Sequence, residues 1–349
     1  MANRITGARV RPLVFAALFI AAALVSMILA VCAGSVKIPL ADVPTVLLCH
    51  IFRQPLPAHV DGAVDTILWT LRAPRVLLAF TVGASLGASG VVMQSVLRNP
   101  LASSYTIGVS AGTSLGVGTL MLFNVTFPAL GLFGYPIVGC ICGIGAITLA
   151  IFFSSALDRD LSSNTIVLVG MVFSLFISAL ISLITALSAT VLQRLTYWQM
   201  GSFSMREWTH TLAVLPVACL LLIALGLRTR ELDILTFGDE QAALIGINVR
   251  REKWLLLYLG AALTGASIAF VGIISFVDLV APHIVRRVFG AKHKVVLPMT
   301  AVCGGTLMVA SDLIARTAIP ASELPVGVVT ALIGAPFFAF VFFRQRKVK

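Results

Sequence analysis

Residues 71–112 read LRAPRVLLAFTVGASLGASGVVMQSVLRNPLASSYTIGVSAG and hold two apolar runs separated by a break at Arg98-Asn99-Pro100. Proline disfavours helix at the residue before it, and arginine is frequent in the cytoplasmic loops of membrane proteins. The stretch therefore predicts two membrane helices joined by a tight cytoplasmic turn. Small residues in the first helix should let neighbouring helices approach closely. These residues are Gly83, Ala84, Gly87, Ala88, Ser89 and Gly90.

The composition of the whole chain is that of a membrane protein. Of its 349 residues, 59% are hydrophobic and 11% are charged, and the mean hydropathy is +1.03. A soluble domain of this composition would expose too much apolar surface. We therefore predict a single all-α integral membrane domain over residues 1–349. We attribute the net charge of +11 to cytoplasmic loops that face anionic lipid, and not to nucleic-acid binding.

Ten segments of the chain are predicted to be transmembrane helices. They are residues 13–32, the two helices of the hairpin, 129–154, 164–190, 209–227, 254–275, a short one near 280–290, 295–315 and 324–343. An even number places both termini on one side of the membrane. Most lysines and arginines lie in the segments of that side, which predicts cytoplasmic termini in a bacterial inner membrane. Residues 35–70 form the longest polar connection and are expected to be irregular.

The first apolar run has a second interpretation as a lipoprotein signal. Residues 29–32, LAVC, resemble a lipobox, but Val31 is too bulky before the cysteine and the run is long for a signal peptide. An uncleaved first helix is therefore preferred.

Residues 83–89 and 260–267 have similar patterns of small residues in helices that are predicted to run in opposite directions. Inverted repeats are common in transporters. Small residues also recur by chance in membrane helices, and the sequence leaves both interpretations open.

The chain contains no P-loop of the form GxxxxGK[ST], so any ATP must be hydrolysed by a partner. Residues 228–253, between the sixth and seventh predicted spans, predict a short amphipathic helix on the cytoplasmic face where such a partner would dock. Gly238 starts the helix, Asp239 and Glu240 favour its positive N-terminal end, and Gly246 loosens its other end. Its apolar face is expected to consist of Ala242, Ala243, Leu244 and Ile247. A helix lying on lipid headgroups is the alternative.

Several sequence blocks occur in an order that resembles the FecCD-type permease subunits of bacterial ABC importers for iron chelates, haem and cobalamin. The blocks are LRAPR (71–75), GASLGASGVVMQ (83–94), RNPLA (98–102), GVSAG (108–112), YWQMGS (197–202), GDEQAALIGI (238–247), FVDLVAPHIVRR (276–287), ASDLIAR (310–316), ELPVGVVTA (323–331) and GAPFF (334–338). The resemblance covers about residues 70–343. Only the first helix and the connection that follows it lie outside the match.

The resemblance implies roles for particular residues. The short helix would be the coupling helix that fits a cleft of the ATPase, and Arg72, Arg75 and Arg316 would meet glutamates of a substrate-binding protein. The cytoplasmic gate would be formed by Asn99, Pro100, Leu101, Ser162, Ser163 and Asn164. Structural motif residues would be Gln94, Pro282, His283, Arg286, Asp312, Glu323, Pro325 and Gly327.

The resemblance also implies an assembly of several subunits. A second permease subunit, either an identical chain or a close paralogue, would complete the pathway, with two ATPase subunits below and a binding protein above. ATP and Mg²⁺ would be bound by the ATPase, and this chain would bind no cofactor. An iron chelate is the expected cargo. A cobalamin importer of the same family is the first alternative, and a secondary transporter that works without an ATPase is the second.

Two positions depart from the family pattern. Asp278 replaces a usual glycine, and Ser103-Ser104 replaces a common Asp-Pro. A carboxylate in a membrane helix costs about 3 kcal/mol on insertion scales, so Asp278 should have a partner or water. A local, solvated variation is the preferred interpretation of Asp278, and a substrate or assembly contact is the alternative. The two serines should be tolerated because serine also initiates helices.

Enzymatic and metal-binding functions find little support in the sequence. A single histidine beside Pro282 is no coordination sphere, so His283 is expected to be structural rather than a haem or metal ligand. The six cysteines lack the spacing of a zinc site. A membrane-embedded enzyme would need a nucleophile, a base and an orienting group, and no such set can be assigned. The intramembrane carboxylates Asp278, Asp312 and Glu323 are too sparse to indicate a proton path.

Overall fold

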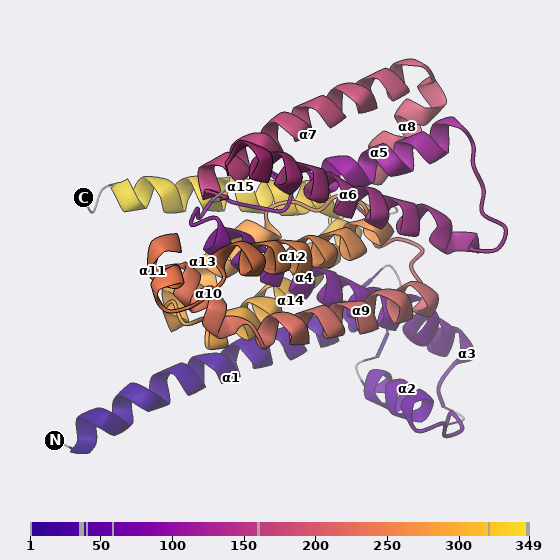
Figure 1. The fold of residues 1–349 in the computed structure, drawn as a ribbon. Helices are drawn as coiled ribbons and strands as arrows, with labels where there is room; N and C mark the ends of the chain where they lie inside the picture. The colour runs from indigo at the N-terminus through magenta and orange to yellow at the C-terminus, as the bar shows by residue number, and fades with distance from the viewer. Residues whose placement is uncertain are drawn as a thin grey trace.

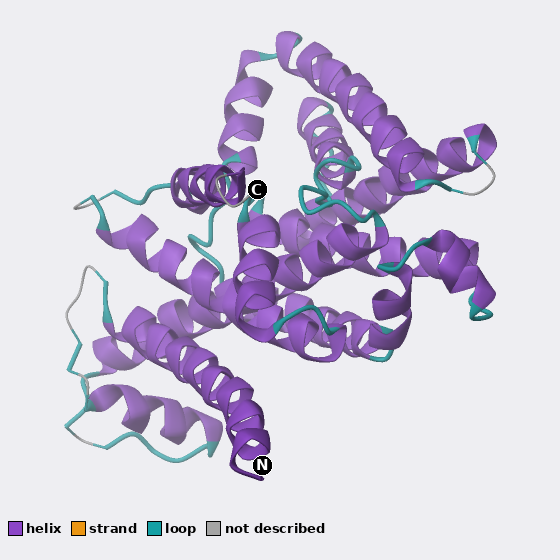
Figure 2. Ribbon diagram, turned by 90° about the vertical axis from the view of Figure 1, so that its left-hand side faces the viewer, coloured by secondary structure: helices purple, strands orange, loops and turns teal. Residues whose placement is uncertain are grey.

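The computed structural model describes residues 2–34, 38–39, 41–57, 59–158, 161–319 and 322–346, and these residues form helices and loops without a named β-strand (Figures 1 and 2). The α-helices are α1 (Ala2–Cys32), α2 (Asp42–Ile51), α3 (Gly62–Asp65), α4 (Ala73–Val96), α5 (Val109–Leu122), α6 (Gly134–Leu157), α7 (Ser163–Ala186), α8 (Ala189–Gln199), α9 (Trp208–Gly226), α10 (Thr229–Leu235), α11 (Asp239–Leu244), α12 (Val249–Val271), α13 (Val277–Phe289), α14 (His293–Thr317) and α15 (Val326–Arg346). A π-helical turn (Thr66–Arg72) precedes α4, and a 3₁₀ turn (Gly131–Phe133) precedes α6.

The predicted all-α membrane fold is confirmed. Seven helical segments of the described chain are long and apolar enough to cross a membrane. They contain α1, α4, α6, α7, α9, α12 and α14. The other three predicted segments are the shorter helices α5 and α13 and the C-terminal helix α15.

The prediction that the connection 35–70 is irregular is wrong for much of its length. Helix α2 forms there because Val43, Val46 and Cys49, at a helical spacing of three residues, are buried on one face. Helix α3 and the π-helical turn continue directly into α4. Residues 35–37, 40 and 58 of the connection lie outside the described residues.

Helix α4, the first helix of the hairpin in residues 71–112, lies in the middle of the bundle with α9, α12, α13 and α14 around it (Figure 1). In the segment that contains α4, 89% of the most apolar window is buried, against 17% in α1. A helix buried on all sides needs small residues where its neighbours cross. A side chain at Gly83 would overlap the carbonyl group of Gly304, and one at Gly90 would overlap that of Asp278. The predicted close packing is confirmed.

The bundle has two chemically distinct ends. The start of α1, the end of α15, and α10 and α11 lie together at one end, which we call the α11 end (Figure 1). Helices α2 and α3 lie at the opposite end. We use the name gate turns for the two segments that the sequence predicts as a gate, residues 99–101 and 162–164. The first is a turn, whereas the second is the N-cap and first two residues of α7 and not a loop. Both gate turns lie at the α11 end, because Arg98 and Leu161, which precede them, are joined to Asp239 and Lys253.

Candidate functional site

The predicted short helix is α11, which begins at Asp239 and ends at Leu244. Gly238, with φ +120°, turns the chain into the helix. At the other end the Gly246 and Ile247 amides donate to the carbonyls of Ala243 (2.9 Å) and Ala242 (3.1 Å), and Gly246 has φ +90°. These two bonds form a Schellman motif, which requires a left-handed residue where glycine stands.

The prediction that the apolar residues of α11 share one face is wrong. Ala242 is fully buried, whereas the Leu244 side chain is 88% exposed and Ala243 is also exposed. Successive residues in a helix are 100° apart, so four residues over 242–247 cannot lie on one face of a helix that ends at Leu244. Leu244, Ile245 and Phe237 therefore present an apolar surface outward at the α11 end.

The two gate turns lie against the ends of the central helices. In the first turn, the Asn99 side chain accepts a hydrogen bond from the Leu101 amide (2.9 Å), which closes the turn before α5. In the second, Ser162 caps α7, and the Ser163 hydroxyl donates to the Val96 carbonyl at the end of α4 (3.4 Å). Leu101 and Asn164 are exposed, and Pro100 is also exposed at the tip of its turn.

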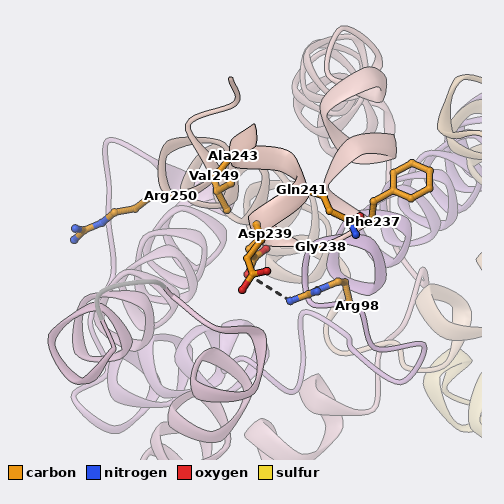
Figure 3. Close-up of a pocket in the computed structure, with 9 residues that line it drawn as sticks. Arg98, Phe237, Gly238, Asp239, Gln241, Ala243, Val249 and Arg250 are labelled. Atoms are coloured by element: carbon orange, nitrogen blue, oxygen red, sulfur yellow. Dashed lines mark hydrogen bonds and ion pairs between the residues drawn. The ribbon is translucent and has the colours of Figure 1, made fainter. Parts of the chain in front are cut away.

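A cavity of about 640 Å³ is lined by α11, the start of α12 and Arg98, which directly precedes the first gate turn. Figure 3 shows Arg98 and Asp239 pointing toward each other at this cavity, with a distance of 3.4 Å between Arg98 Nη2 and Asp239 Oδ2, and Arg250 pointing away. Glu240 also lines the cavity. Asp239 Oδ2 accepts a second hydrogen bond from the Lys253 ammonium group (2.7 Å). Lys253 was not predicted as a site residue. The sequence shows only that this lysine directly precedes the predicted membrane span 254–275.

The three arginines predicted to dock a binding protein come together at the opposite end, where they line a pocket of about 390 Å³. Arg75 Nη2 lies 2.8 Å from Asp312, and its Nη1 lies 2.9 Å from Glu323. Arg72 Nη1 donates to the carbonyls of Val31 (2.9 Å) and Cys32 (2.6 Å).

Arg316 donates to the Ala30 carbonyl and lies 3.6 Å from Asp312. The last carbonyls of a helix have no partner within the helix, so Arg72 and Arg316 satisfy the C-terminal end of α1. Much of the hydrogen-bonding capacity of the three arginines is thus used inside the chain. Two carboxylates that partly neutralise them, Asp312 and Glu323, also belong to this chain.

Arg206 is a fourth arginine of the same pocket and was not predicted from the sequence. It follows the YWQMGS block in the loop before α9, and the charge count places it with Arg72, Arg75 and Arg316 on the side opposite the cytoplasmic segments. Its one hydrogen-bond contact is with His210, at 3.4 Å, and its Nε atom is buried without a hydrogen-bond partner among the described residues. Burial lowers the pKa of Arg206, a guanidinium group that stays charged at neutral pH.

Glu323 lies in the loop between α14 and α15, at the rim of this pocket. Burial raises the pKa of Glu323, but the hydrogen bond and positive charge of Arg75, with smaller contributions from Ser204 and Arg316, together outweigh burial and hold that pKa below its ordinary value. Glu323 is therefore ionised at neutral pH, and its carboxylate favours the position that Arg75 occupies.

Two predicted motif residues, Gln94 and Pro282, are linked by one carbonyl group. Pro282 lies inside α13 and has no N–H to donate to the carbonyl of Asp278, four residues earlier. The Gln94 side chain of α4 donates to that carbonyl instead, at 3.3 Å. The glutamine thus satisfies a buried acceptor that the proline leaves open.

The other motif residues of α13 face polar groups near the α11 end. Arg286 donates to the Ser95 hydroxyl of α4 (2.8 Å), and the same hydroxyl lies 2.7 Å from His293. The second nitrogen of His293 lies 2.6 Å from Asp233 of α10. His283 is half-buried on α13. Among the described residues, no three His, Cys, Asp or Glu side chains gather into a group that could hold a metal ion.

The ELPVG block packs on the YWQMGS block. The amides after Pro325 make this contact: Val326 donates to the Gly201 carbonyl (3.0 Å) and Gly327 to the Met200 carbonyl (3.1 Å). A side chain at Gly327 would overlap the Met200 carbonyl, so the approach needs glycine. Two blocks separated by about a third of the chain therefore form one structural unit.

Asp278 and Ser103, the two departures from the family pattern, contact each other. The Ser103 hydroxyl donates to the Asp278 carboxylate, and Asp278 is only 2% exposed. The expectation of a partner is confirmed. The preference for a solvated variation is wrong, because packing of α13 on α4 covers the carboxylate.

Comparisons with known proteins agree with this architecture. The chain matches the FecCD transport family over residues 2–344. The chain belongs to the FecCD transport family. Members of this family are the membrane permease components of ABC importers, in which separate subunits supply the ATPase and the binding protein.

Relatives of this FecCD-family chain differ in the cargo for which they are named. The hemin transport system permease protein HmuU of Yersinia pestis is 38% identical over 85% of this chain and 89% of its own length. The cobalamin import system permease protein BtuC of Halobacterium salinarum is 34% identical over 90% and 83%. A solved inward-facing structure, described as a putative ABC transporter of the metal-chelate type, matches with a TM-score of 0.82 and 28% identity, over 95% of this chain and 99% of the solved chain.

Proposed function

We propose that this chain is the permease subunit of a binding-protein-dependent ABC importer that carries an iron chelate across the cytoplasmic membrane. The observation that carries the proposal is the pairing of two sites at opposite ends of one bundle. An exposed apolar surface on and beside α11 marks one end, and an arginine-lined pocket marks the other. Relatives named for hemin and for cobalamin support a bulky chelate as cargo.

The proposed assembly has two permease subunits, either two copies of this chain or this chain and a close paralogue. Two ATPase subunits bind at the α11 end, which is cytoplasmic together with both termini, and bind ATP and Mg²⁺. A substrate-binding protein docks at the arginine end. This chain itself hydrolyses no ATP and binds no cofactor.

Transport follows from a shift between two conformations. The gate turns close the pathway between the two permease subunits on the cytoplasmic side. Binding of ATP moves the ATPase subunits and, with them, α11, which favours the conformation that is open to the other side of the membrane. A ligand shifts such an equilibrium only by binding one state more tightly than the other.

Docking of the binding protein is proposed to use charge complementarity. Arg206 lies at the same pocket as Arg72, Arg75 and Arg316. Among the described residues it forms no ion pair, whereas Arg75 and Arg316 both contact a carboxylate, so Arg206 is the best placed to meet a carboxylate of the partner. Exposed ion pairs contribute only about 0–1 kcal/mol each, so these pairs orient docking and raise its rate.

The docking proposal is tested with Arg206→Glu and with Arg194→Glu as the control, because Arg194 is exposed on α8 outside the pocket. Association of the binding protein with nanodisc-embedded complex should slow in the Arg206 variant and lose part of its salt dependence, while the control is unchanged. Equal association rates for both variants and the native complex would remove Arg206 from the docking surface.

The cargo is tested by uptake into proteoliposomes that contain the full complex and ATP. The probes are a radiolabelled ferric hydroxamate siderophore, haemin and cyanocobalamin. We expect accumulation of an iron-containing probe with the full complex and none with the isolated chain. Accumulation of cyanocobalamin alone would establish the cobalamin alternative, and accumulation by the isolated chain would establish a secondary transporter.

A further inference from the structure

We propose that Asp239 and Lys253 are positioning residues that join α11 to both gate turns, so that displacement of α11 moves the two turns together. The inference rests on the proposed function, in which α11 contacts the ATPase and the turns form the gate. It adds the side chains that connect these parts.

Lys253 is the less expected member of the connection. It lies near the start of α12 and is 0% exposed, whereas Arg250 and Arg251 beside it are exposed. A lysine at the end of a membrane helix can extend its charged group into water at little cost. Burial of this ammonium group therefore requires specific partners.

The partners of Lys253 come from two different parts of the chain. Its Nζ atom donates to Asp239 Oδ2 at 2.7 Å and to the carbonyl of Leu161 at 2.8 Å. Leu161 directly precedes the second gate turn, is fully buried and has a left-handed backbone with φ +51°. Lys253 thus holds the start of this turn to the first residue of α11.

The same carboxylate also holds the first gate turn. Asp239 Oδ2 lies 3.4 Å from Arg98 Nη2, and Arg98 directly precedes residues 99–101 with φ +49° (Figure 3). One oxygen atom on α11 therefore contacts a cation beside each gate turn. The weaker, more exposed contact is with Arg98, and the buried, shorter one is with Lys253.

The burial of Lys253 explains why the connection would transmit movement. If α11 moved without the second gate turn, Lys253 would lose either its carboxylate or its carbonyl acceptor while remaining inside the protein. Leaving the buried Lys253 charge without one of its partners is unfavourable, although Asp239 itself is partly exposed. The lower-energy response is for Leu161 and α11 to move as a unit.

The experiment measures the movement of each gate turn separately. Spin labels are placed at Leu101→Cys or Asn164→Cys, with a reference label at Leu212→Cys on α9, in a chain whose six native cysteines are replaced by alanine. All three label positions are exposed. Double electron–electron resonance then reports both distances in the complete complex, without nucleotide and with ATP and vanadate.

The variants separate the two connections. Lys253→Met keeps the length of the side chain and removes its charge, and it should abolish the nucleotide-dependent shift at position 164 while that at 101 remains. Arg98→Met should abolish the nucleotide-dependent shift at position 101 while the shift at 164 remains. Asp239→Asn should weaken the shifts at both positions. Lys253→Arg retains the charge and should restore the shift at 164. Lys294→Met is the matched control, because Lys294 is an exposed lysine at the start of α14, and it should change neither distance.

The outcomes distinguish this inference from the proposed function. A native-sized shift at position 164 in Lys253→Met, with the ATPase still bound, would overturn the inference alone. Failure of the ATPase to bind the native chain, or the absence of any shift in the native complex, would overturn the proposed function and the inference together. If Lys253→Met does not assemble, the same criterion is applied to Asp239→Asn, where native-sized shifts at both positions would overturn the inference.

Discussion

Asp278 is a carboxylate at a buried helix crossing, and its environment is set by single atoms of neighbouring helices. Its Oδ2 accepts from the Ser103 hydroxyl, its backbone carbonyl accepts from Gln94, and its Oδ1 atom is buried without a hydrogen-bond partner among the described residues. The family pattern has a common aspartate at position 103 and a usual glycine at position 278. In this chain the carboxylate is at 278 instead, and the residue at 103 is the serine that contacts it. The two departures are therefore best understood together.

Removal of the Ser103 hydroxyl should destabilise the protein. Ser103→Ala leaves the Asp278 carboxylate without its side-chain donor, and a buried group left unsatisfied costs about 1–3 kcal/mol. We expect a lower melting temperature in detergent. Ser103→Ala combined with Asp278→Gly should recover most of the loss, because both polar groups are then absent. Ser178→Ala, on the exposed side of α7, is the control, and equal losses in the single and double variants would contradict the paired interpretation.

Glu323 gives a pH-dependent prediction at the residue scale. Its pKa is below the ordinary value in the folded protein, so its contribution to stability is present above the ordinary pKa and is lost as the pH falls through the lowered one. The melting temperatures of the native protein and Glu323→Gln should therefore differ at pH 7, and the difference should shrink as the pH falls below the ordinary glutamate pKa of about 4.3 and vanish below the lowered one. A difference that stays constant over this range would show that the Arg75 contact does not depend on ionisation of Glu323.

At the scale of elements, α11 is a short helix whose two ends are defined by glycines. Gly238 and Gly246 both have positive φ, and a side chain at Gly246 would meet no atom within 4 Å. Gly246 is thus required for its backbone conformation and not for space. The helix is joined to the rest of the chain mainly through the buried Ala242 and the Asp239 ion pairs, so its outer surface is available to a partner.

Substitution of Gly246 should alter α11 without disturbing the bundle. A left-handed conformation costs a residue with a side chain about 1–2 kcal/mol, so Gly246→Val should disorder the end of α11 and reduce co-purification of the ATPase. Gly145→Val is the matched control, because a side chain at Gly145 would also meet no atom within 4 Å, but Gly145 lies within α6 at an ordinary helical φ. Full co-purification with Gly246→Val would count against α11 as the ATPase contact.

At the scale of the whole molecule, the two ends of the helix bundle differ in the side chains that they expose. The α11 end carries an outward apolar surface and the gate turns, and the opposite end carries four arginines around one pocket. If the arginine pocket docks the binding protein and α11 contacts the ATPase, as proposed, the buried central helix α4 connects the two sites within one subunit.

The orientation of the molecule can be measured directly. Because the end of α15 lies at the α11 end, alkaline phosphatase fused after Arg346 should be inactive, while green fluorescent protein at this position should fluoresce (Figure 1). Phosphatase fused after Leu187, between α7 and α8, should be active because that loop lies at the opposite end. The reverse pattern would place the arginine pocket in the cytoplasm and contradict the docking proposal.

The sequence by itself determined the features that depend on local pattern. Apolar length predicted the membrane segments, the break at Arg98-Asn99-Pro100 predicted the first gate turn, and glycines bounded α11. Prediction failed where burial depends on neighbours distant in sequence. Helix α2 was missed because its apolar face is short, and the expected single apolar face of α11 was wrong because Ala242 packs inward.

Only the tertiary structure decided which side chains act together. The Ser103–Asp278 pair and the Lys253–Asp239–Leu161 connection join residues separated by up to 175 positions, and no local spacing encodes such contacts. The same holds for the arginines, since packing of α1 against α14 gives Arg316 a carbonyl acceptor, and packing of α1 against the π-helical turn gives Arg72 its acceptors. Hydrophobic length specifies that a helix enters the membrane, whereas the bonding of its polar residues depends on which helices the fold brings alongside.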